Sequence, residues 1–375
     1  MKTIRVATVF SGIGAFEFAL KRLNIPHKIV FACDNGEIEV EYDQNKEMNI
    51  IKSLPNAKEK CIYTENLYKS LSRKTNFVKQ SYLANYNDKN LLFFEDIKLL
   101  DGADFKNKVD IFVGGSPCQS FSSVGFQHGL DDARGTLFYE FARLVKEIKP
   151  KVFIYENVRN LINHDNGKTW NKIKEIFYSL GYKISFDILN AADYGIPQNR
   201  RRLFVVGFLN EIVSFEFPTK CKLKYKMSDF LETNCAFGYF KYNKKGDIVI
   251  KNYKGAVSDK YYLTPLLYKY VMKGGTKTFY QKPVINKEIA RTLLKTMGNR
   301  HRAGIDNYVS SDGSTEYGKV RMLTEREAHR LMGFTDDYKI LVSRAQAYKQ
   351  AGNSIVVDVM MKIIKEILKS IGSES

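Results

Sequence analysis

A cysteine on a loop is the residue in this 375-residue chain whose type and position most directly suggest chemistry. Cys118 closes the segment Gly114-Gly115-Ser116-Pro117-Cys118, which follows the apolar run at residues 111–113. A strand followed by glycine, serine and proline predicts a loop at the carboxyl edge of a sheet, where a thiolate can reach a ligand. Free cysteines are more often buried in cores. The composition of this loop favours a nucleophile instead.

Two further segments place an acid and several arginines next to predicted strands. Glu156 and Asn157 end the apolar run that begins at residue 152, and Gln198-Asn199-Arg200-Arg201-Arg202 precedes the run at residues 203–206. Ligands of open α/β sheets bind outside the ends of the strands, so these groups are expected to line the same cleft as Cys118. In that position a carboxyl group can act as a general acid.

A glycine turn near the amino terminus has the form of a nucleoside-binding site. Gly12-Ile13-Gly14 follows the β-branched run at residues 4–10, and Asp34 ends the next predicted strand, at residues 28–32. Glycines let the backbone approach a ligand, and an acid at the next strand end bonds ribose hydroxyls. Glu17 replaces the third glycine of the dinucleotide fingerprint, which argues against NAD and a dehydrogenase. A plain tight turn explains this segment alone equally well.

Strands alternate with helical patterns along most of the chain, which predicts an α/β fold with a mixed, mostly parallel sheet flanked by helices. The expected strands are at residues 4–10, 28–32, 111–113, 152–155 and 203–206, and the expected helices at 15–23, 136–148, 170–180 and 353–371. The polar segment 36–95 interrupts the pattern as an insertion, and residues 213–323 form a separate small domain.

The charge of the chain is concentrated in that small domain. Residues 213–323 hold 21 Lys and Arg against 9 Asp and Glu, which is +12 of the net +18. A charge run is usually a solvated face, but so lopsided a segment favours a surface that binds phosphates.

Other classes of protein are disfavoured by what the sequence lacks. The sequence has no run of about 18 apolar residues, so we expect no membrane span. Arg5 interrupts the start of the chain, which lacks the apolar stretch of a signal peptide. The five cysteines are an odd number without a Cys-x-x-Cys pair, which argues against a disulfide framework and a zinc site. We expect no bound metal and a reducing cytoplasm.

The order of the motifs resembles the DNA cytosine-5 methyltransferases. The matching segments are Phe10-Ser11-Gly12-Ile13-Gly14, Pro117-Cys118-Gln119, Glu156-Asn157-Val158, Gln198-x-Arg200-x-Arg202, Arg321-x-Leu323-Thr324-x-Arg326-Glu327, Arg330-Leu331-Met332-Gly333-Phe334 and Gln350-Ala351-Gly352-Asn353-Ser354. The likeness covers nearly the whole chain except residues 36–95 and about 213–290. Its compact form is similar to the bacterial type II restriction-modification enzymes.

The resemblance implies transfer of a methyl group from S-adenosylmethionine to C5 of a cytosine flipped out of duplex DNA. It implies that Cys118 adds to C6 of the ring and that Glu156 supplies a proton to N3. Arg202, and more loosely Arg200, match positions that hold O2 of the base. The base that removes the C5 proton is not identified by the sequence.

The resemblance also implies the residues of the cofactor site. They are Phe10, Ser11, Gly12, Ile13 and Gly14 around the methionine and adenine portions, Asp34 on the ribose, Asp96 and Ile97 at the adenine edge, Asn35, Pro117 and Leu137 along the lining, and Asn353 and Ser354 at the methionine end. Two positions depart from the family pattern. Thr8 stands where an aspartate is common, and Asn35 where an aromatic ring often packs on adenine.

Domains and partners follow from the same resemblance. Residues 1–212 and 324–375 are expected to form a Rossmann-like S-adenosylmethionine-dependent catalytic domain, and 213–323 a target-recognition domain and hinge. Double-stranded DNA is the expected partner, with a possible cognate restriction endonuclease, for a monomer in the bacterial cytoplasm. The expected DNA contacts are Gln119, Ser122, Arg291, Arg300 and Arg302. Arginines on a turn can read guanine edges, although a hinge whose arginines touch only phosphate remains open.

Two other functions compete with this interpretation. One is an RNA cytosine-5 methyltransferase acting on tRNA, but the Cys-Phe-Thr signature of that branch is absent. The other is a nucleic-acid-binding protein with an inactive catalytic centre, against which the intact Cys118, Glu156 and Arg202 count.

Overall fold

The computed structural model describes residues 3–86, 88, 90–117, 137–209, 214–232, 239–251, 257–274, 282–298, 301, 304–310 and 312–372. The chain divides into two compact units. The first consists of residues 1–189, 201–218 and 361–375, and the second of residues 190–200 and 219–360.

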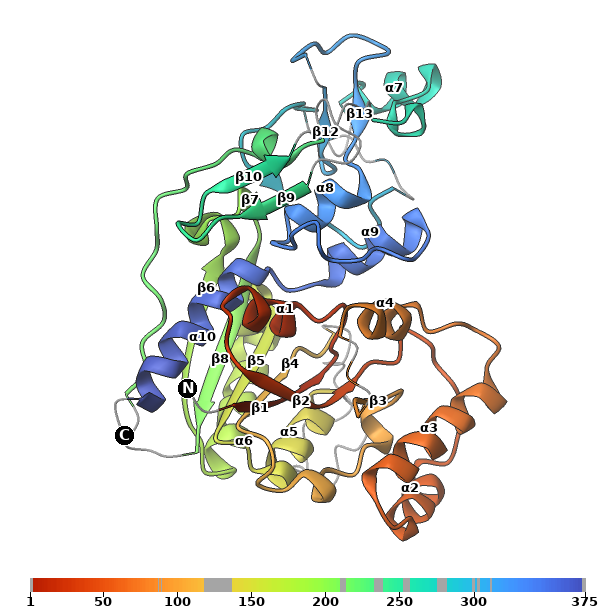
Figure 1. Ribbon diagram of the computed structural model, residues 1–375, viewed down its shortest axis with the longest axis vertical. Coiled ribbons are helices and arrows are strands. Elements are labelled where there is room, and N and C mark those ends of the chain that lie inside the picture. Colours follow the sequence, from red (N-terminus) through yellow and green to blue (C-terminus); the bar gives the residue numbers. More distant parts are fainter. Residues whose placement is uncertain are drawn as a thin grey trace. The chain divides into compact units, whose positions relative to one another are not determined.

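The first unit is built on a seven-stranded sheet in the order β3-β2-β1-β4-β5-β8-β6 (Figure 1). Its strands are β1 (Ile4–Val9), β2 (His27–Cys33), β3 (Leu92–Phe94), β4 (Ile111–Gly114), β5 (Val152–Val158), β6 (Lys183–Asn190) and β8 (Arg201–Phe208). Strands β1 to β5 pair in parallel, and β8 runs antiparallel to β5. The predicted α/β fold with a mixed, mostly parallel sheet is confirmed.

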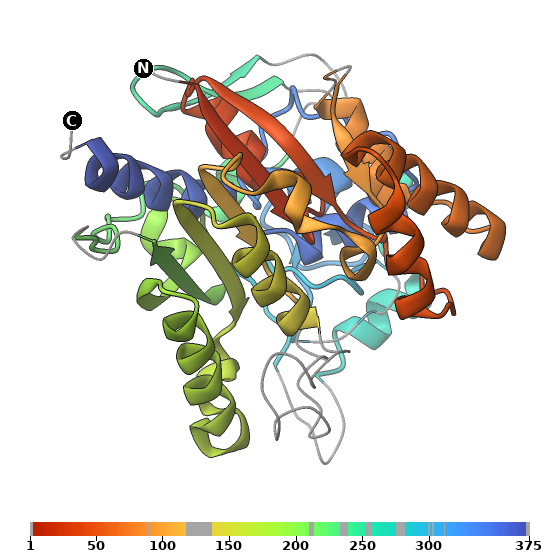
Figure 2. The same cartoon turned by 90° about the horizontal axis from the view of Figure 1, so that it is seen from below.

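Helices cover both faces of this sheet (Figures 1 and 2). α5 (Leu137–Ile148) and α6 (Lys168–Ser179) pack on one face, where Phe141 and Phe177 meet Phe153 of β5 in an aromatic core. α1 (Ala15–Arg22) and the first unit's part of α10 (Val357–Gly372) lie on the other face. Strands buried between two layers of helices read as continuous apolar runs, which is why the sequence predicted β1, β2, β4, β5 and β8. It did not predict the three-residue β3 or the partly exposed β6.

The insertion at 36–95 holds three helices that the sequence analysis did not predict: α2 (Gln44–Ser53), α3 (Ala57–Leu71) and α4 (Phe77–Asn85). Their N-caps are Asp43, Asn56 and Asn76, whose side chains accept hydrogen bonds from first-turn amides. The insertion ends in the edge strand β3. The 3₁₀ helices η1 (Ile97–Leu99), η2 (Gly102–Phe105) and η4 (Arg159–Gly167) complete the unit.

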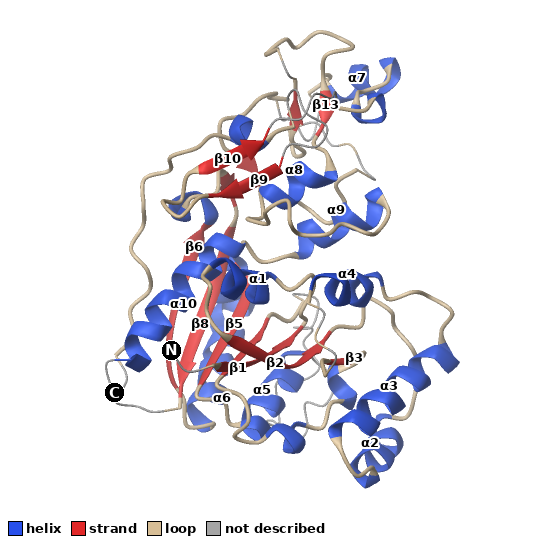
Figure 3. Cartoon of the chain, in the orientation of Figure 1, coloured by secondary structure: helices blue, strands red, loops and turns tan. Residues whose placement is uncertain are grey.

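The second unit consists of short elements joined by long loops (Figure 3). They are η5 (Ala191–Tyr194), β7 (Gln198–Asn199), η6 (Met227–Phe230), β9 (Tyr239–Tyr242), β10 (Ile248–Lys251), η7 (Asp259–Tyr261), α7 (Pro265–Val271), β11 (Ala290–Arg291), β12 (Tyr308–Val309), β13 (Arg321–Met322), α8 (Glu325–Arg330) and α9 (Arg344–Asn353). Buried ion pairs stabilise this unit: Arg321 of β13 pairs with Glu327 of α8 at 2.8 Å, and Arg330 of α8 pairs with Asp336 of the following loop at 2.6 Å.

Residues 324–360 belong to the second compact unit. One reason is Gln198, whose side-chain amide donates to the Leu331 carbonyl at 2.8 Å and accepts from the Leu293 amide at 3.0 Å. The expected division into a catalytic domain at 1–212 and 324–375 and a target-recognition domain at 213–323 stays a prediction. The assignment of residues 324–375 to cofactor binding stays a prediction. Of the described helices, none combines the length and the apolar character that a membrane crossing requires.

Candidate active site

The pairing of β5 with β8 brings the predicted acid next to one of the predicted arginines. Val158 lies opposite Arg202 and Glu156 opposite Phe204 in this antiparallel ladder. The Arg202 Nε lies 3.1 Å from the Glu156 Oε1, and the two side chains are 21% and 14% exposed. A half-sheltered ion pair is screened less by salt than a pair on the open surface.

The loop after β4 passes directly over the Glu156 carboxylate. A Cβ at Gly115 would lie 2.9 Å from the Glu156 Oε2 and 2.9 Å from its carbonyl oxygen. Carbon and oxygen do not approach so closely without a shift, so position 115 requires glycine. The second glycine of the Gly114-Gly115 pair therefore permits the close approach of loop and acid.

A buried network anchors the same loop to the end of β5. The Asn157 Nδ2 donates to the Ser116 carbonyl at 3.0 Å and to the Tyr155 Oη at 2.9 Å, and the hydroxyls of Ser116 and Tyr155 lie 2.7 Å apart. The roles of Ser116, Tyr155 and Asn157 could not be predicted from the sequence. The position of Asn157 immediately after the predicted acid was the available signal.

Several predicted site residues lie outside the part of the chain that the structure describes. They are the predicted nucleophile Cys118 and the predicted DNA contacts Gln119, Ser122, Arg300 and Arg302. Pro117, the last described residue of the loop, is exposed.

Arg200 differs from Arg202 in its surroundings. Its side chain is buried in the second unit, where the guanidinium donates to the carbonyls of Leu293, Gly352 and Ser354 at 2.8–2.9 Å. These bonds hold three segments of that unit together. The direct catalytic role expected for Arg200 stays a prediction, and the contacts that the structure gives it are structural.

The glycine turn and Asp34 come together at the carboxyl ends of β1 and β2. The Asp34 carboxylate accepts from the Gly12 amide at 2.9 Å through one oxygen and from the Gly36 amide at 2.8 Å through the other. Gly12 and Gly14 have φ angles of +53° and +76°, which favour glycine. Burial raises the pKa of Asp34, and the two amides oppose that rise.

The first two residues of the turn are held in different ways. Phe10 has a φ of +51° and packs against the core of the first unit. The Ser11 hydroxyl accepts from the Cys33 amide at 3.0 Å and thereby joins β1 to β2. Ile13 is buried. The turn is thus fixed from both strands.

Thr8, one of the two departures from the family pattern, has a local explanation. Its hydroxyl donates to the Glu17 carboxylate of α1 at 2.8 Å, and both side chains are almost fully buried. Burial raises the pKa of Glu17. An aspartate at position 8 would face this acid without water to screen it, so a hydroxyl fits better.

The residues expected near adenine follow β2 and β3. Asp96 and Ile97 are buried, and Leu137 packs against the core at the start of α5. The Asn35 side chain closes its own turn: its Oδ1 accepts from the Glu37 amide at 3.0 Å and its Nδ2 donates to the Ile38 carbonyl at 3.1 Å. Asn35 therefore stabilises its own loop, at the position where an aromatic ring often packs on adenine in the family.

In the second unit, Asn353 is exposed at the end of α9, and Ser354 is buried beside it. Arg291 is half-buried, and its backbone amide donates to the Asn307 side chain at 2.8 Å. Burial lowers the pKa of Arg291. Contacts of these residues with a cofactor or with DNA stay predictions.

The chain is similar to one family of known proteins over most of its length. The family model of the C-5 cytosine-specific DNA methylases matches residues 53–369. The type II methyltransferase M.SsoII of Shigella sonnei is 36% identical over 309 residues, which cover 79% of this chain and 73% of that protein. The type II methyltransferase M2.ScrFI of Lactococcus lactis subsp. cremoris is 33% identical over 98% of this chain and 99% of its own length.

A solved structure supports the fold independently of close sequence likeness. The S. pombe Dnmt2 methyltransferase superposes with a TM-score of 0.66 at 18% identity, with 99% of each chain covered. The motif order, the sheet and the family match agree, and the chain belongs to the C-5 cytosine-specific DNA methylase family.

Proposed function

We propose that this enzyme transfers a methyl group from S-adenosylmethionine to C5 of a cytosine within a specific sequence of duplex DNA. The observation that carries the proposal is the Glu156–Arg202 pair beneath Gly115, three residues before Cys118 in the sequence. An acid and a cation on adjacent strands, with a thiol three residues further along the sequence from the glycine above them, are the groups that this chemistry needs.

In the proposed reaction the Cys118 thiolate forms a bond to C6, while Glu156 donates a proton to N3 and Arg202 holds O2. The electrons displaced from the C5–C6 double bond make C5 nucleophilic, and C5 takes the methyl group, so that S-adenosylhomocysteine leaves with the electron pair of the broken carbon–sulfur bond. A base then removes the C5 proton, the C6–sulfur bond breaks to release the thiolate, and N3 returns its proton to the Glu156 carboxylate, which restores the ring. Such positioned acids contribute about a hundredfold or more to the rate.

The glycine turn and Asp34 fit the nucleoside part of S-adenosylmethionine, which supplies an activated methyl group when bound. Each Asp34 oxygen accepts one backbone amide, and a carboxylate oxygen has two lone pairs. Within the described residues one acceptor position on each oxygen is left for a ribose hydroxyl. A Cβ at Gly12 would meet nothing within 4 Å, so the backbone there leaves room for a ligand.

For DNA recognition we propose residues 213–323, with their excess of positive charge. Arg291, Arg300 and Arg302, with Gln119 and Ser122 of the catalytic loop, would contact the duplex around the flipped base. A monomer acting beside a cognate restriction endonuclease suits the type II relatives. The free thiols of Cys33, Cys61 and Cys221 suit a reducing bacterial cytoplasm.

Methylation of plasmid DNA in cells that express the protein tests this function. Bisulfite sequencing should show protected cytosines at one recurring sequence, and the Cys118→Ala variant should leave the plasmid unmodified. In parallel, purified protein with labelled S-adenosylmethionine should label duplex DNA and not tRNA. Labelling of tRNA alone would replace DNA by RNA as the substrate, and labelling of neither would contradict the proposal.

A further inference from the structure

The insertion at residues 36–95 directs hydrogen-bonding side chains at the segments that are expected to hold the cofactor. Tyr42 and Tyr68 bond Asp96, Asn76 bonds the Asp34 carbonyl, and Tyr86 bonds the Gly14 carbonyl. Strands β3, β2 and β1 are neighbours in the sheet, so the segments that follow them lie at neighbouring strand ends. The insertion lies between β2 and β3 in the chain.

The contacts at Asp96 are the most specific. The hydroxyls of Tyr42 and Tyr68 each donate to the Asp96 Oδ2 at 2.6 Å, and the Lys98 amide donates to Oδ1 at 2.9 Å. Four lone pairs are available on a carboxylate. Within the described residues three are used, which leaves a single acceptor position, on Oδ1.

The two tyrosines are suited to hold this carboxylate in one orientation. Tyr68 is buried and Tyr42 is half-buried. Burial and the neighbouring Asp96 raise the pKa of both phenols, so both remain hydrogen-bond donors at any physiological pH. Because three donors fix the orientation of the Asp96 carboxylate, the direction of its remaining lone pair is fixed as well.

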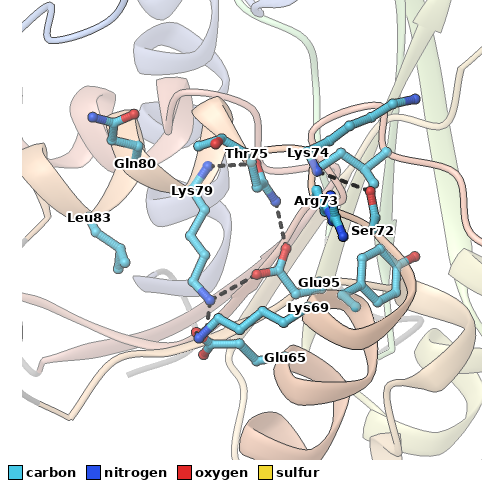
Figure 4. A pocket seen from close by; sticks show the side chains of 13 residues that line it. Glu65, Lys69, Ser72, Arg73, Lys74, Thr75, Lys79, Gln80, Leu83 and Glu95 are labelled. Carbon is cyan, nitrogen blue, oxygen red and sulfur yellow. Dashed lines mark hydrogen bonds and ion pairs between the residues drawn. The ribbon is translucent and has the colours of Figure 1, made fainter.

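Asn76 joins the ends of β2 and β3. Its Nδ2 donates to the Asp34 carbonyl at 2.8 Å and to the Glu95 Oε2 at 2.7 Å. Lys79 holds the other Glu95 oxygen at 2.9 Å and also pairs with Glu65 at 3.1 Å (Figure 4). A Cβ at Gly36 would lie 2.4 Å from the Asn76 Oδ1, so this joint is closely packed.

Helix α4 and its C-cap residue Tyr86 support the glycine turn and α1 from the same insertion. The Tyr86 hydroxyl donates to the Gly14 carbonyl at 2.5 Å, and a Cβ at Gly14 would overlap the Tyr86 ring. Tyr82 donates to the Glu17 carboxylate at 2.7 Å. Three segments of the expected cofactor site are therefore bonded to one insertion.

We infer that the insertion is a working part of the cofactor site, in which Tyr42 and Tyr68 are positioning residues that aim the last acceptor of Asp96 at the 6-amino group of adenine. The inference rests on the proposed function. Asp96 would distinguish adenine from other purines, because a hydrogen-bond acceptor binds an amino group at position 6 and repels a carbonyl oxygen at the same position. The tyrosines act through Asp96 and need not touch the ligand.

Calorimetric binding of two thioethers tests the inference without turnover. S-adenosylhomocysteine carries the 6-amino donor, whereas S-inosylhomocysteine carries a carbonyl there. The native protein should bind the adenosyl compound at least about tenfold more tightly, as expected for a hydrogen bond to a charged group. In the Tyr42→Phe/Tyr68→Phe variant this preference should fall at least about threefold, because the carboxylate is no longer fixed.

The matched control is Tyr63→Phe, which removes a 2.6 Å hydrogen bond from tyrosine to Glu47 in the same insertion. It should leave the preference between the two compounds unchanged. Asp96→Asn should reduce the preference as the tyrosine pair does. Phenylalanine keeps the ring packing, and thermal melting of each variant reports any general loss of stability.

The outcomes separate the inference from the proposed function. Failure of the native protein to bind either compound contradicts the proposed function itself. Binding with an unchanged preference in the tyrosine variant overturns the inference, even when both affinities fall together, because that is the signature of a purely structural role. An unchanged preference in Asp96→Asn overturns it as well.

Discussion

The Nε of Arg202 lies 3.1 Å from the Oε1 of Glu156, across an antiparallel pair of strands that is fixed by backbone hydrogen bonds. The arginine therefore holds the acid from one side, while Gly115 passes over its other oxygen. The geometry leaves Glu156 a narrow range of orientations at the point where the predicted base would enter.

Glu156→Gln should lower the single-turnover rate of methylation by about a hundredfold or more, because an amide cannot donate an acidic proton to N3. Cofactor affinity should change much less. Quenched-flow measurements with labelled cofactor give the rate. Glu175→Gln, at an exposed acid on α6, is the control and should behave like the native enzyme. A near-native rate in Glu156→Gln would remove this residue from the mechanism.

Gly115→Ala should impair catalysis through the acid rather than through folding. The added methyl would lie 2.9 Å from both the carboxylate and the carbonyl of Glu156, so the loop or the acid must shift. A displacement of about 1 Å at reacting groups can cost about a hundredfold in rate. Gly372→Ala, where a Cβ meets nothing within 4 Å, is the control. Unaltered turnover in Gly115→Ala would show that the close approach is dispensable.

Cys118→Ala should abolish the covalent complex with DNA that contains 5-fluorocytosine at the target position, because fluorine at C5 cannot leave as a proton does. Duplex binding should persist. A denaturing gel detects the adduct, and a mobility shift measures the binding. Cys221→Ala removes an exposed free thiol elsewhere and should still form the adduct. An adduct in Cys118→Ala would assign the nucleophile to another residue.

Lys222→Ala should weaken binding to cognate and scrambled duplexes equally and reduce the salt slope of the binding constant by about one. Lys222 is exposed, whereas the neighbouring Lys224 and Lys226 already pair with Asp247 and Glu288. Fluorescence anisotropy at several salt concentrations measures the slope.

The same binding measurements on Arg300→Ala and Arg302→Ala test the arginines that are expected to read bases. Each should instead weaken cognate binding selectively, by about 1–3 kcal/mol for a lost bidentate contact to guanine. Equal losses on cognate and scrambled duplexes would assign both arginines to the hinge.

The pH dependence of stability should include a contribution from Glu232. Burial raises the pKa of Glu232 to about 7 in the folded protein, from the ordinary value of 4.5. The folded state therefore holds a proton that the unfolded state has released between these values, and stability falls as pH rises from 4.5 to 7. Glu232→Gln, which carries no titrating proton, should flatten this decline.

Urea unfolding at several pH values measures the effect of Glu232→Gln. The exposed Glu216→Gln should retain the native pH profile. If the stability of Glu232→Gln fell with pH as steeply as that of the native protein, the pH dependence would belong to other buried acids. Glu17 is one such acid, and its pKa is also raised.

Five of the seven strands of the sheet, and the residues at their ends, could be predicted from the residues alone, whereas β3 and β6 could not. Residues 111–113, 152–155 and 203–206 read as buried runs because both faces of these strands are covered by apolar side chains, and all of them lie within observed strands. The glycine turn and Asp34 could be joined in advance because adjacent parallel strands end at the same edge. Local chemistry and a general rule of sheet geometry were sufficient for these.

The arginine that meets the acid, and the contacts of the insertion, could be recognised only in the folded chain. Arg200 and Arg202 are two residues apart, yet one bonds carbonyls at positions 293, 352 and 354 while the other bonds Glu156. The helices of the insertion are polar, and their bonds to Gly14, Asp34 and Asp96 join residues that lie 28 to 72 positions apart. Such contacts carry no periodic signal, because they depend on where the folded backbone places each side chain rather than on the residues beside it in the chain.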